Sequence, residues 1–231
     1  MLNDTKRDLT LMARKLIKPY EQYSIDESFL DMSGTQKLFG PPLEVAHKIK
    51  DRIYDELGFT VNVGISSNKL LAKMAGDFEK PNKVHTLFPE EIEEKMWPLP
   101  VRELLYVGGA TARKLQERYL YTIGDVARAD PALLQALLGK WGPVLHAMAN
   151  GRDSQPVLPA DLHSPVQSVS NGMTTPRDLQ DERDVQRVIT ALAESVGRRL
   201  REQHLAGRTV ELQLRDNALV THTYRGTADR Y

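Results

Sequence analysis

Residues 154–165 divide this chain into parts that we expect to fold around separate cores. The segment contains three prolines and few side chains that could pack in an interior. Such a composition favours a semi-extended tether between domains. Because the chain has 231 residues, it is long enough for two or three small domains, each with a core of its own.

The overall composition excludes some kinds of site and leaves the choice of partner open. Lys and Arg total 31, and Asp and Glu also total 31, so the net charge does not point to an acidic partner. The absence of cysteine excludes disulfides and thiolate metal sites, and it fits a reducing compartment. No segment resembles a signal peptide or is apolar over the length needed to cross a membrane. We therefore expect a soluble, cytoplasmic protein.

Residues 1–98 alternate between helical and strand patterns. In chain order, the expected elements are a helix over 5–18, a strand or hairpin over 23–31, a helix over 43–57, a strand over 59–65, a helix over 70–75 and a strand over 84–88. The second helix is expected to end at Gly58, and the run Ser66-Ser67-Asn68 is expected to cap the third. The inward-facing positions of the helix over 43–57 are predicted to be Leu43, Ala46, Ile49, Ile53 and Leu57. The order of elements predicts an α/β or α+β sheet with helices on one face.

Two adjacent acids, Asp26 and Glu27, lie inside the apolar, strand-like run 23–31. Burying an unpaired carboxylate is unfavourable, and a strand directs successive side chains to opposite faces. For both acids to face one ligand, the backbone must turn or bulge there, or the pair must cap a hairpin. A divalent cation such as Mg²⁺ or Mn²⁺ would offset the repulsion between them. The alternative is that one acid faces solvent while the other forms a salt bridge.

Residues 99–153 have a helical pattern with a glycine turn near the start. The run from Leu104 to Leu115 predicts a helix, a tight turn at Gly108 and Gly109, and a second helix. Such a helix-hairpin-helix offers backbone N–H groups to a phosphate, with Arg113 and Lys114 one step inside. An ordinary turn between two helices of a small bundle is the alternative. Further helices are expected from Tyr121 and over 133–149.

Residues 166–231 are expected to form a small α+β domain. The predicted elements are a strand over 166–174, a helix over 181–203, and a hairpin of strands over 209–215 and 219–224. Every Lys or Arg position in this block is occupied by arginine. Three arginines lie at the end of this helix: Arg198, Arg199 and Arg201. They could serve the helix dipole, which favours cations at this end, or they could contact phosphate, and the sequence favours neither role over the other.

Three segments of the first block carry a family resemblance: Tyr23-Ser24-Ile25-Asp26-Glu27-Ser28-Phe29-Leu30-Asp31, Val63 to Ala75, and Lys80-Pro81-Asn82. In colinear order they resemble the palm motifs of Y-family translesion DNA polymerases, the bacterial polymerase IV and UmuC-like group. The similarity continues through the helical segment to Thr174-Thr175-Pro176-Arg177-Asp178, which resembles part of the family's DNA-binding little finger. It covers nearly the whole chain.

The resemblance implies an α/β (α+β) fold in four parts. These are an incomplete ferredoxin-like palm over 1–98 with a residual fingers–palm helix at its start, a helix-hairpin-helix thumb over 99–153, a linker over 154–165, and an incomplete α+β little finger over 166–231. The implied activity is template-directed DNA synthesis past damaged bases, a nucleotidyl transfer used in DNA repair and the SOS response.

The resemblance also implies roles for individual residues. Asp26 and Glu27 match the acids that help to hold two Mg²⁺ ions (Mn²⁺ is possible) and so act in catalysis. Lys80 matches a lysine that contacts the phosphates of the incoming deoxynucleoside triphosphate, a suitable task for a compact point charge. Contacts to primer–template DNA are expected from Gly108, Gly109, Thr111, Arg113, Lys114 and Arg177. Asp31 is interpreted as a hairpin or surface acid, and Lys73 as either helix surface or phosphate-facing.

The chain departs from the family pattern at both ends and in the thumb. The family's palm begins with a strand that carries another metal-binding aspartate beside an aromatic residue that excludes ribonucleotides, and this sequence has neither. The little finger of the family continues further and is usually followed by a tail that binds a sliding clamp. We therefore expect a fragment with little or no polymerase activity, whose exposed palm edge favours self-association. Tyr106 stands where the thumb often has its first glycine, so Gly108 and Gly109 are expected to re-form the turn in a shifted register.

Two other functions remain open from the sequence. One is a non-catalytic DNA-binding protein that keeps the thumb hairpin and the arginine-rich third block. The other is a different two-metal nucleotidyl enzyme with a ferredoxin-like palm, such as a cyclase. The thumb hairpin and the run Lys80-Pro81-Asn82 argue against the cyclase.

Overall fold

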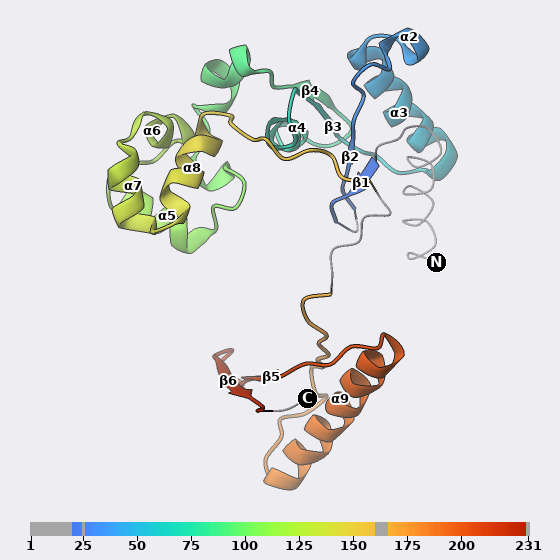
Figure 1. Cartoon of the computed structure of the whole chain (residues 1–231), viewed down its shortest axis with the longest axis vertical. Coiled ribbons are helices and arrows are strands. Elements are labelled where there is room, and N and C mark those ends of the chain that lie inside the picture. The colour runs from blue at the N-terminus through green and yellow to red at the C-terminus, as the bar shows by residue number, and fades with distance from the viewer. Residues whose placement is uncertain (1–19, 25, 160–165, 230–231) are drawn as a thin grey trace. The chain divides into compact units, whose positions relative to one another are not determined.

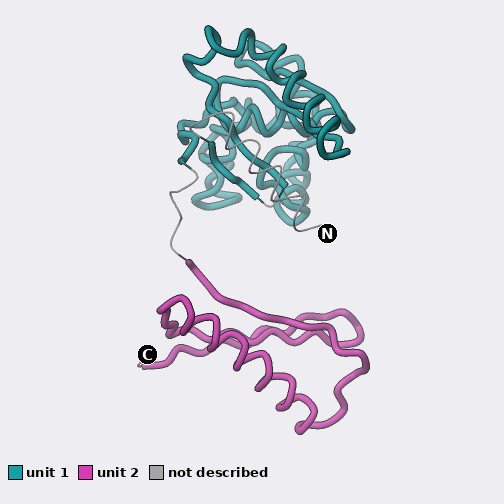
Figure 2. Tube along the Cα trace, turned by 90° about the vertical axis from the view of Figure 1, so that its right-hand side faces the viewer, with its two compact units in different colours: residues 1–162 teal, residues 163–231 magenta. Residues whose placement is uncertain are grey.

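The computed structural model of the protein describes residues 20–24, 26–159 and 166–229. The chain packs as two compact units, residues 1–162 and 163–231 (Figure 2). The boundary between them falls inside the proline-rich segment 154–165. The helix expected over 5–18 lies outside the described residues.

The first unit opens with a β-hairpin followed by two helices. Strand β1 (Tyr20–Gln22) pairs antiparallel with β2 (Ser28–Leu30), and helices α2 (Gln36–Phe39) and α3 (Pro42–Leu57) follow. Helix α3 ends at Gly58 as predicted, because a left-handed residue with a φ of 70° closes it. The predicted inward face of α3 is partly wrong: Val45 and Ala46 are buried, whereas Leu43 is 49% exposed. The short helix α2 was not expected.

A tight strand–helix–strand unit comes next. Strands β3 (Val63–Ile65) and β4 (Val84–Thr86) are parallel, and α4 (Lys69–Gly76) connects them. Asn68 caps α4 as predicted, since its side chain accepts a hydrogen bond from the Leu71 N–H. A Cβ atom on Gly64 would lie 2.0 Å from the Ala72 carbonyl oxygen, so only glycine lets α4 pack this closely on β3. In the described part, β1–β2 and β3–β4 form two separate two-stranded sheets (Figure 1).

Residues 89–149 are almost entirely helical, and we call residues 99–153 the helical region. Three short turns, η1 (Pro89–Glu91), η2 (Ile92–Met96) and η3 (Val101–Glu103), lead into α5 (Gly109–Gln116), α6 (Ile123–Arg128), α7 (Pro131–Leu138) and α8 (Trp141–Ala149). Figure 1 shows these four helices gathered in one bundle. The first helix of the predicted helix-hairpin-helix is reduced to η3. The helix expected over 133–149 is broken at Gly139, whose φ is 62°.

One apolar core runs through the first unit. It joins the buried face of α4 to η2 and to the helical region; its members include Leu71, Leu87, Met96, Leu104, Leu115, Ile123 and Leu134. Gly151 lies at the joint, because a Cβ atom there would be 2.3 Å from Ile92 Cδ1 and 3.2 Å from Leu71 Cδ2. The helical region therefore has no core separate from that of α4.

The second unit is a helix and a hairpin. Helix α9 (Glu182–Glu202) is followed by β5 (Thr209–Arg215) and β6 (Thr221–Thr227), which pair antiparallel as predicted. The strand predicted over 166–174 is wrong, because this stretch has no regular secondary structure. The Ser170 carbonyl of this stretch accepts a hydrogen bond from the Arg199 guanidinium of α9 at 2.7 Å. A side chain therefore donates to this carbonyl in place of the backbone N–H of a neighbouring strand. Within residues 166–229 no side chain is fully buried.

Among the described residues, no helix combines the length and the apolar character needed to cross a membrane.

Candidate active site

Asp26 and Glu27 lie in the connection between β1 and β2, at the tip of the hairpin. The turn is closed by the Glu27 carbonyl oxygen, which accepts hydrogen bonds from the N–H groups of Tyr23 at 3.0 Å and Ser24 at 3.1 Å. The prediction that the acids cap a hairpin is therefore confirmed. The turn removes the alternation that a regular strand would impose on the two side chains.

Ser24 orients the first acid. Its hydroxyl donates a hydrogen bond to Asp26 Oδ1 at 2.7 Å, and the Asp26 N–H lies 3.4 Å from the same hydroxyl oxygen. This bond is local and restricts the orientation of the carboxylate. From the sequence, Ser24 was expected only as a supporting position without a separate role.

The second acid is held from α4. Lys73 Nζ lies 2.5 Å from Glu27 Oε1 and 2.7 Å from Asp77 Oδ2. Asp77 in turn accepts from Lys80 Nζ at 2.7 Å. The four side chains form a row of alternating charge, Glu27–Lys73–Asp77–Lys80, which leads from the turn to the loop after α4. The salt bridge that the sequence left open as an alternative is thus formed by Glu27.

The charges of this row are stabilised by one another. Burial acts against the charged form of Lys73, but hydrogen bonds and ion pairs with Asp77 and Glu27 raise its pKa. Burial likewise acts to raise the pKa of Asp77, and the two lysines outweigh it and lower that pKa. Asp77 was missed from the sequence. The signal was its spacing, four residues after Lys73 and three before Lys80.

Lys80 stands on a braced loop. Its side chain is 60% exposed, and its partner is Asp77. Asn62, just before β3, holds the loop: its amide donates to the carbonyls of Gly76 at 3.0 Å and Glu79 at 2.7 Å, and its oxygen accepts from the Lys83 N–H at 3.0 Å. Asn62 was also missed, because its partners lie 14 to 21 residues away in the chain.

The donor set at the hairpin tip fits Mg²⁺ or Mn²⁺ in kind, since both prefer carboxylate oxygens. It is small in number: within the described residues, no group of three or more His, Cys, Asp or Glu side chains could hold a metal ion. Asp31 does not extend the set, because its carboxylate accepts from the Ser33 N–H at 2.8 Å. Hydrogen bonds from the Ser33 side chain and backbone lower the pKa of Asp31, as expected for a hairpin acid.

The glycine turn of the helical region keeps its register at Tyr106. This residue has a φ of 68°, in the left-handed region that glycine normally fills, whereas Gly108 has a φ of −78°. The predicted shift of the turn to Gly108 and Gly109 is therefore wrong: tyrosine itself adopts the strained conformation.

Of the predicted phosphate-binding residues, Gly108 and Gly109 lie at the start of α5, whereas Arg113 and Lys114 lie in its last turn. Gly108 is the N-cap of α5 and has no side chain that could cap the helix. The remaining predicted contacts follow along α5: Gly109, Arg113 and Lys114 are exposed, and Thr111 is half-buried.

In the second unit, Arg177 is paired. Its guanidinium donates to Asp184 Oδ2 at 2.7 Å, and the side chain is 68% exposed. A phosphate at Arg177 would therefore compete with a carboxylate of α9.

Family comparisons match three segments of the chain. Residues 2–77 match the family described as impB/mucB/samB, residues 166–230 match the C-terminal domain of that family, and residues 89–118 match its helix-hairpin-helix motif. The three segments lie in the order expected for one protein and together cover most of the chain.

Curated relatives agree with this match. The DNA polymerase IV of Acetivibrio thermocellus is 43% identical over 213 residues, which are 90% of this chain and 53% of that protein. The DNA polymerase IV of Pelotomaculum thermopropionicum is 44% identical over 85% of this chain and 48% of its own length. DNA polymerase IV 2 of Bacillus subtilis is 39% identical over 90% of this chain and 52% of its own length. This chain spans about half the length of these relatives.

Solved structures show the same fold. A Y-family DNA polymerase chimera of Dbh and Dpo4 matches with a TM-score of 0.80 and 23% identity, over 99% of this chain and 65% of the other. An insertion ternary complex of Dbh DNA polymerase matches with a TM-score of 0.61 and 23% identity, over 98% of this chain and 64% of the other. The mixed α+β fold predicted from the sequence is confirmed by these neighbours.

Proposed function

Because this chain belongs to the impB/mucB/samB family of Y-family DNA polymerases, we propose that it carries the acids and the DNA-contacting turn of a translesion polymerase. The observation that carries the proposal is the hairpin tip, where Asp26 and Glu27 lie side by side at the end of a row of charged side chains. The reaction would be template-directed attack of a primer 3′ hydroxyl on a deoxynucleoside triphosphate.

Asp26 and Glu27 would hold the divalent cations. Two bound Mg²⁺ ions supply a lowered pKa for the attacking hydroxyl and neutralise the charge that develops on the phosphate. Ser24 fixes the Asp26 carboxylate through its hydroxyl, so this acid is already oriented. Glu27 forms a salt bridge with Lys73, and its carboxylate would have to leave that ammonium group to bind a metal ion.

Lys73 and Lys80 would neutralise the triphosphate. Both ammonium groups form salt bridges with the Asp77 carboxylate, Lys73 with Oδ2 and Lys80 with Oδ1. A cation at Glu27 would weaken the hold on Lys73, and a triphosphate would offer both lysines more negative charge than Asp77 does. In this reading Asp77 keeps two phosphate-binding lysines in place before the nucleotide arrives.

DNA would be bound through its phosphates. Gly108 and Gly109 present the start of α5, while Thr111, Arg113 and Lys114 follow on the same helix. Arg177 would add a contact from the second unit after leaving Asp184. Contacts of this kind are independent of sequence and sensitive to salt.

Other parts of the proposal concern the chain by itself and its partners. With two carboxylates at the hairpin, we expect little primer extension from the 231 residues without a further acid. Self-association through the unpaired edges of the two-stranded sheets, and recruitment by a sliding clamp, belong to the same proposal.

The decisive test is primer extension with Mg²⁺ and deoxynucleotides. The chain would be joined to the preceding palm segment of the Acetivibrio thermocellus relative and compared with its Asp26→Asn variant. Asp55→Asn, an exposed acid on α3, is the matched control. We expect extension to fall to background in Asp26→Asn and to persist in Asp55→Asn.

Two outcomes would contradict parts of this proposal. Extension at the parental rate by Asp26→Asn would remove Asp26 from the metal site. No extension by the joined chain, with salt-sensitive binding to primer–template intact, would favour the non-catalytic DNA-binding alternative.

The DNA contact has its own test. Replacing Arg113 and Lys114 by alanine should reduce the slope of log affinity against log salt by about 2, since each phosphate contact contributes about 0.9. The matched control replaces Lys37 and Lys48, two exposed lysines of α2 and α3, and should leave the slope unchanged. An unchanged slope after the Arg113 and Lys114 exchange would exclude α5 from the DNA surface.

A further inference from the structure

Tyr106 occupies a backbone position that disfavours it. Its φ of 68° lies in the left-handed region, where a side chain with a Cβ atom is strained. A glycine would take the same conformation without this cost. The side chain is 60% exposed, so burial does not repay the strain. The contacts that the ring and hydroxyl make are therefore the features to account for.

The hydroxyl of Tyr106 reaches the acidic hairpin. It lies 2.9 Å from the hydroxyl of Tyr23, a hydrogen bond between residues 83 positions apart. Tyr23 is in the turn itself, since its N–H donates to the Glu27 carbonyl oxygen. The Tyr23 ring is fixed on its other side by Phe29 of β2, edge to face at 5.3 Å. The hydrogen bond with Tyr106, together with burial, raises the pKa of Tyr23 to about 12, so the Tyr23 hydroxyl stays protonated at neutral pH.

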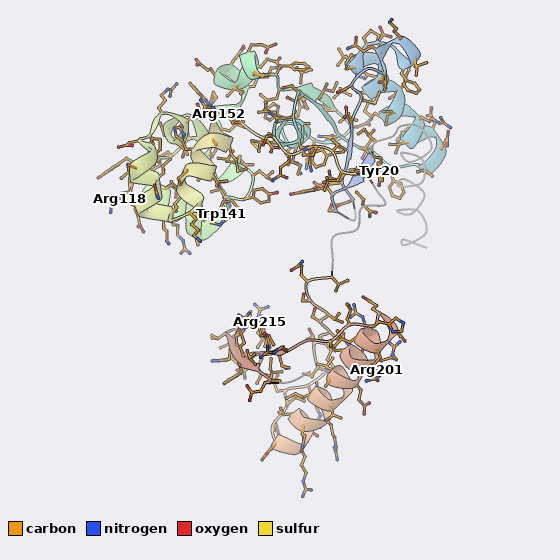
Figure 3. All side chains as sticks on the ribbon, in the orientation of Figure 1. Tyr20, Arg118, Trp141, Arg152, Arg201 and Arg215 are labelled. Carbon is orange, nitrogen blue, oxygen red and sulfur yellow. The ribbon has the colours of Figure 1, made fainter. Side chains whose placement is uncertain are left out.

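The ring of Tyr106 is anchored in the helical bundle. Its centroid lies 6.3 Å from that of Trp141, at the start of α8, where Figure 3 labels this tryptophan. Two residues after Tyr106 comes Gly108, the N-cap of α5. A series of aromatic side chains thus links β2 to α8 and passes between the acids and the proposed phosphate-binding turn: Phe29, Tyr23, Tyr106 and Trp141.

We propose that Tyr106 is a positioning residue that fixes the spacing between the start of α5 and the hairpin bearing Asp26 and Glu27. This inference rests on the proposed function, because the spacing matters only if α5 binds the DNA backbone while the acids act on the primer end. The core joins the helical region to α4, and the tyrosine pair adds a direct bond between that region and the hairpin tip. A phosphate held at Gly108 is then held at a set distance from the two carboxylates.

The test measures this spacing and DNA affinity in the same set of variants. The chain has no cysteine, so cysteines introduced at Gln22 of β1 and Gln135 of α7, both exposed, take spin labels at these two sites alone. The distance distribution between the labels is recorded for the parent, Tyr23→Phe, Tyr106→Phe and the double variant. Binding to a fluorescent primer–template duplex is measured by anisotropy.

We expect each single exchange to broaden the distance distribution and to weaken duplex binding by about threefold, as for the loss of one hydrogen bond. The double variant should match the single ones, because both remove the same bond. Tyr119→Phe is the control: Tyr119 also has a left-handed φ of 61°, lies in the same region and is 80% exposed. It should change neither measurement.

Each other outcome overturns the inference in a recognisable way. A distribution as narrow as that of the parent in both single variants shows that the tyrosine pair does not fix the spacing. A broader distribution with unchanged affinity shows a structural link that does not position DNA. Failure of the parent to bind the duplex at any salt overturns the proposed function, and the role of Tyr106 toward DNA with it.

Discussion

The two units place similar patterns in very different surroundings. In the first unit, α4 lies against a strand on one side and the helical bundle on the other, and Leu71, Leu87 and Leu115 are fully excluded from solvent. In the second unit, the longer helix α9 has a clear apolar stripe, yet no residue between 166 and 229 is fully buried. An amphipathic pattern therefore predicts a helix more reliably than it predicts a core.

This difference bears on where the proposed chemistry lies. Lys73 lies on α4, which packs on the shared core, and Lys80 lies in the loop that follows α4. The hairpin that carries the acids is bonded to α4 through the Glu27–Lys73 and Glu21–Lys69 ion pairs. The second unit contributes exposed arginines, which suit contacts to a DNA backbone and need little rigidity.

The largest expected effect breaks the core of the first unit. Leu71→Ala removes a fully buried side chain from α4 and should cost about 2–5 kcal/mol of unfolding free energy. Both tryptophans, Trp97 and Trp141, lie in the first unit, so urea unfolding followed by tryptophan fluorescence reports on this unit. Val188→Ala on α9 should leave the same curve unchanged. A loss as large from Val188→Ala would mean that the two units share stability.

A second, smaller effect compares a glycine from a strand of each unit. Gly64→Ala places a methyl group 2.0 Å from the Ala72 carbonyl and should cost about 1–3 kcal/mol, as α4 is pushed off β3. Gly226→Ala on β6 meets no atom within 4 Å and should be tolerated. Gly76→Ala is the local control, since its nearest neighbour would be at 3.7 Å. Equal losses at Gly64 and Gly76 would contradict the steric explanation.

The sequence predicted the parts of this fold that depend on local signals. The end of α3 at Gly58, the Asn68 cap and the β5–β6 hairpin are set by residues a few positions apart, and all three were correct. The turn at Asp26 and Glu27 was also predicted, because two adjacent acids cannot share one face of a regular strand.

The parts that were missed depend on partners far apart in the chain. The stretch 166–174, expected as a strand, has no ladder partner among the described residues. Asn62 and the Tyr23–Tyr106 bond span 14 to 83 residues, a range at which periodicity carries no information. The left-handed backbone conformation of Tyr106 was missed because glycine is the residue that usually adopts it.

A third prediction compares an ion pair from each unit, and the effect expected for Asp77 is at most about 1 kcal/mol because its ion pairs are partly exposed. The lysines lower the pKa of Asp77 in the folded state, so its contribution is present at neutral pH and is lost as the pH falls through that lowered pKa. Asp77→Asn should therefore remove stability at pH 7 and little at pH 3, as measured by tryptophan fluorescence in urea. Glu211→Gln, which breaks a pair with Arg225 on the exposed hairpin, should leave the curve unchanged at both pH values. A loss from Asp77→Asn that is the same at pH 7 and pH 3 would contradict the linkage.

The smallest effect concerns the hydrogen bond between Tyr23 at the hairpin tip and Tyr106 in the helical region. It tests whether this bond holds the hairpin to the helical region in solution. The pKa of Tyr23 is raised to about 12 from an ordinary 10.0, chiefly by its hydrogen bond to Tyr106. The neutral hydroxyl is the favoured form, so its contribution to stability is complete below pH 10 and is lost as the pH rises toward 12. Subtracting the tyrosinate absorbance of Tyr23→Phe from that of the parent should isolate one ionisation near pH 12. In a Tyr106→Phe background the same subtraction should give an ionisation closer to pH 10. If the midpoint of the Tyr23 ionisation is the same in the two backgrounds, the hydrogen bond between the hairpin and the helical region does not form in solution.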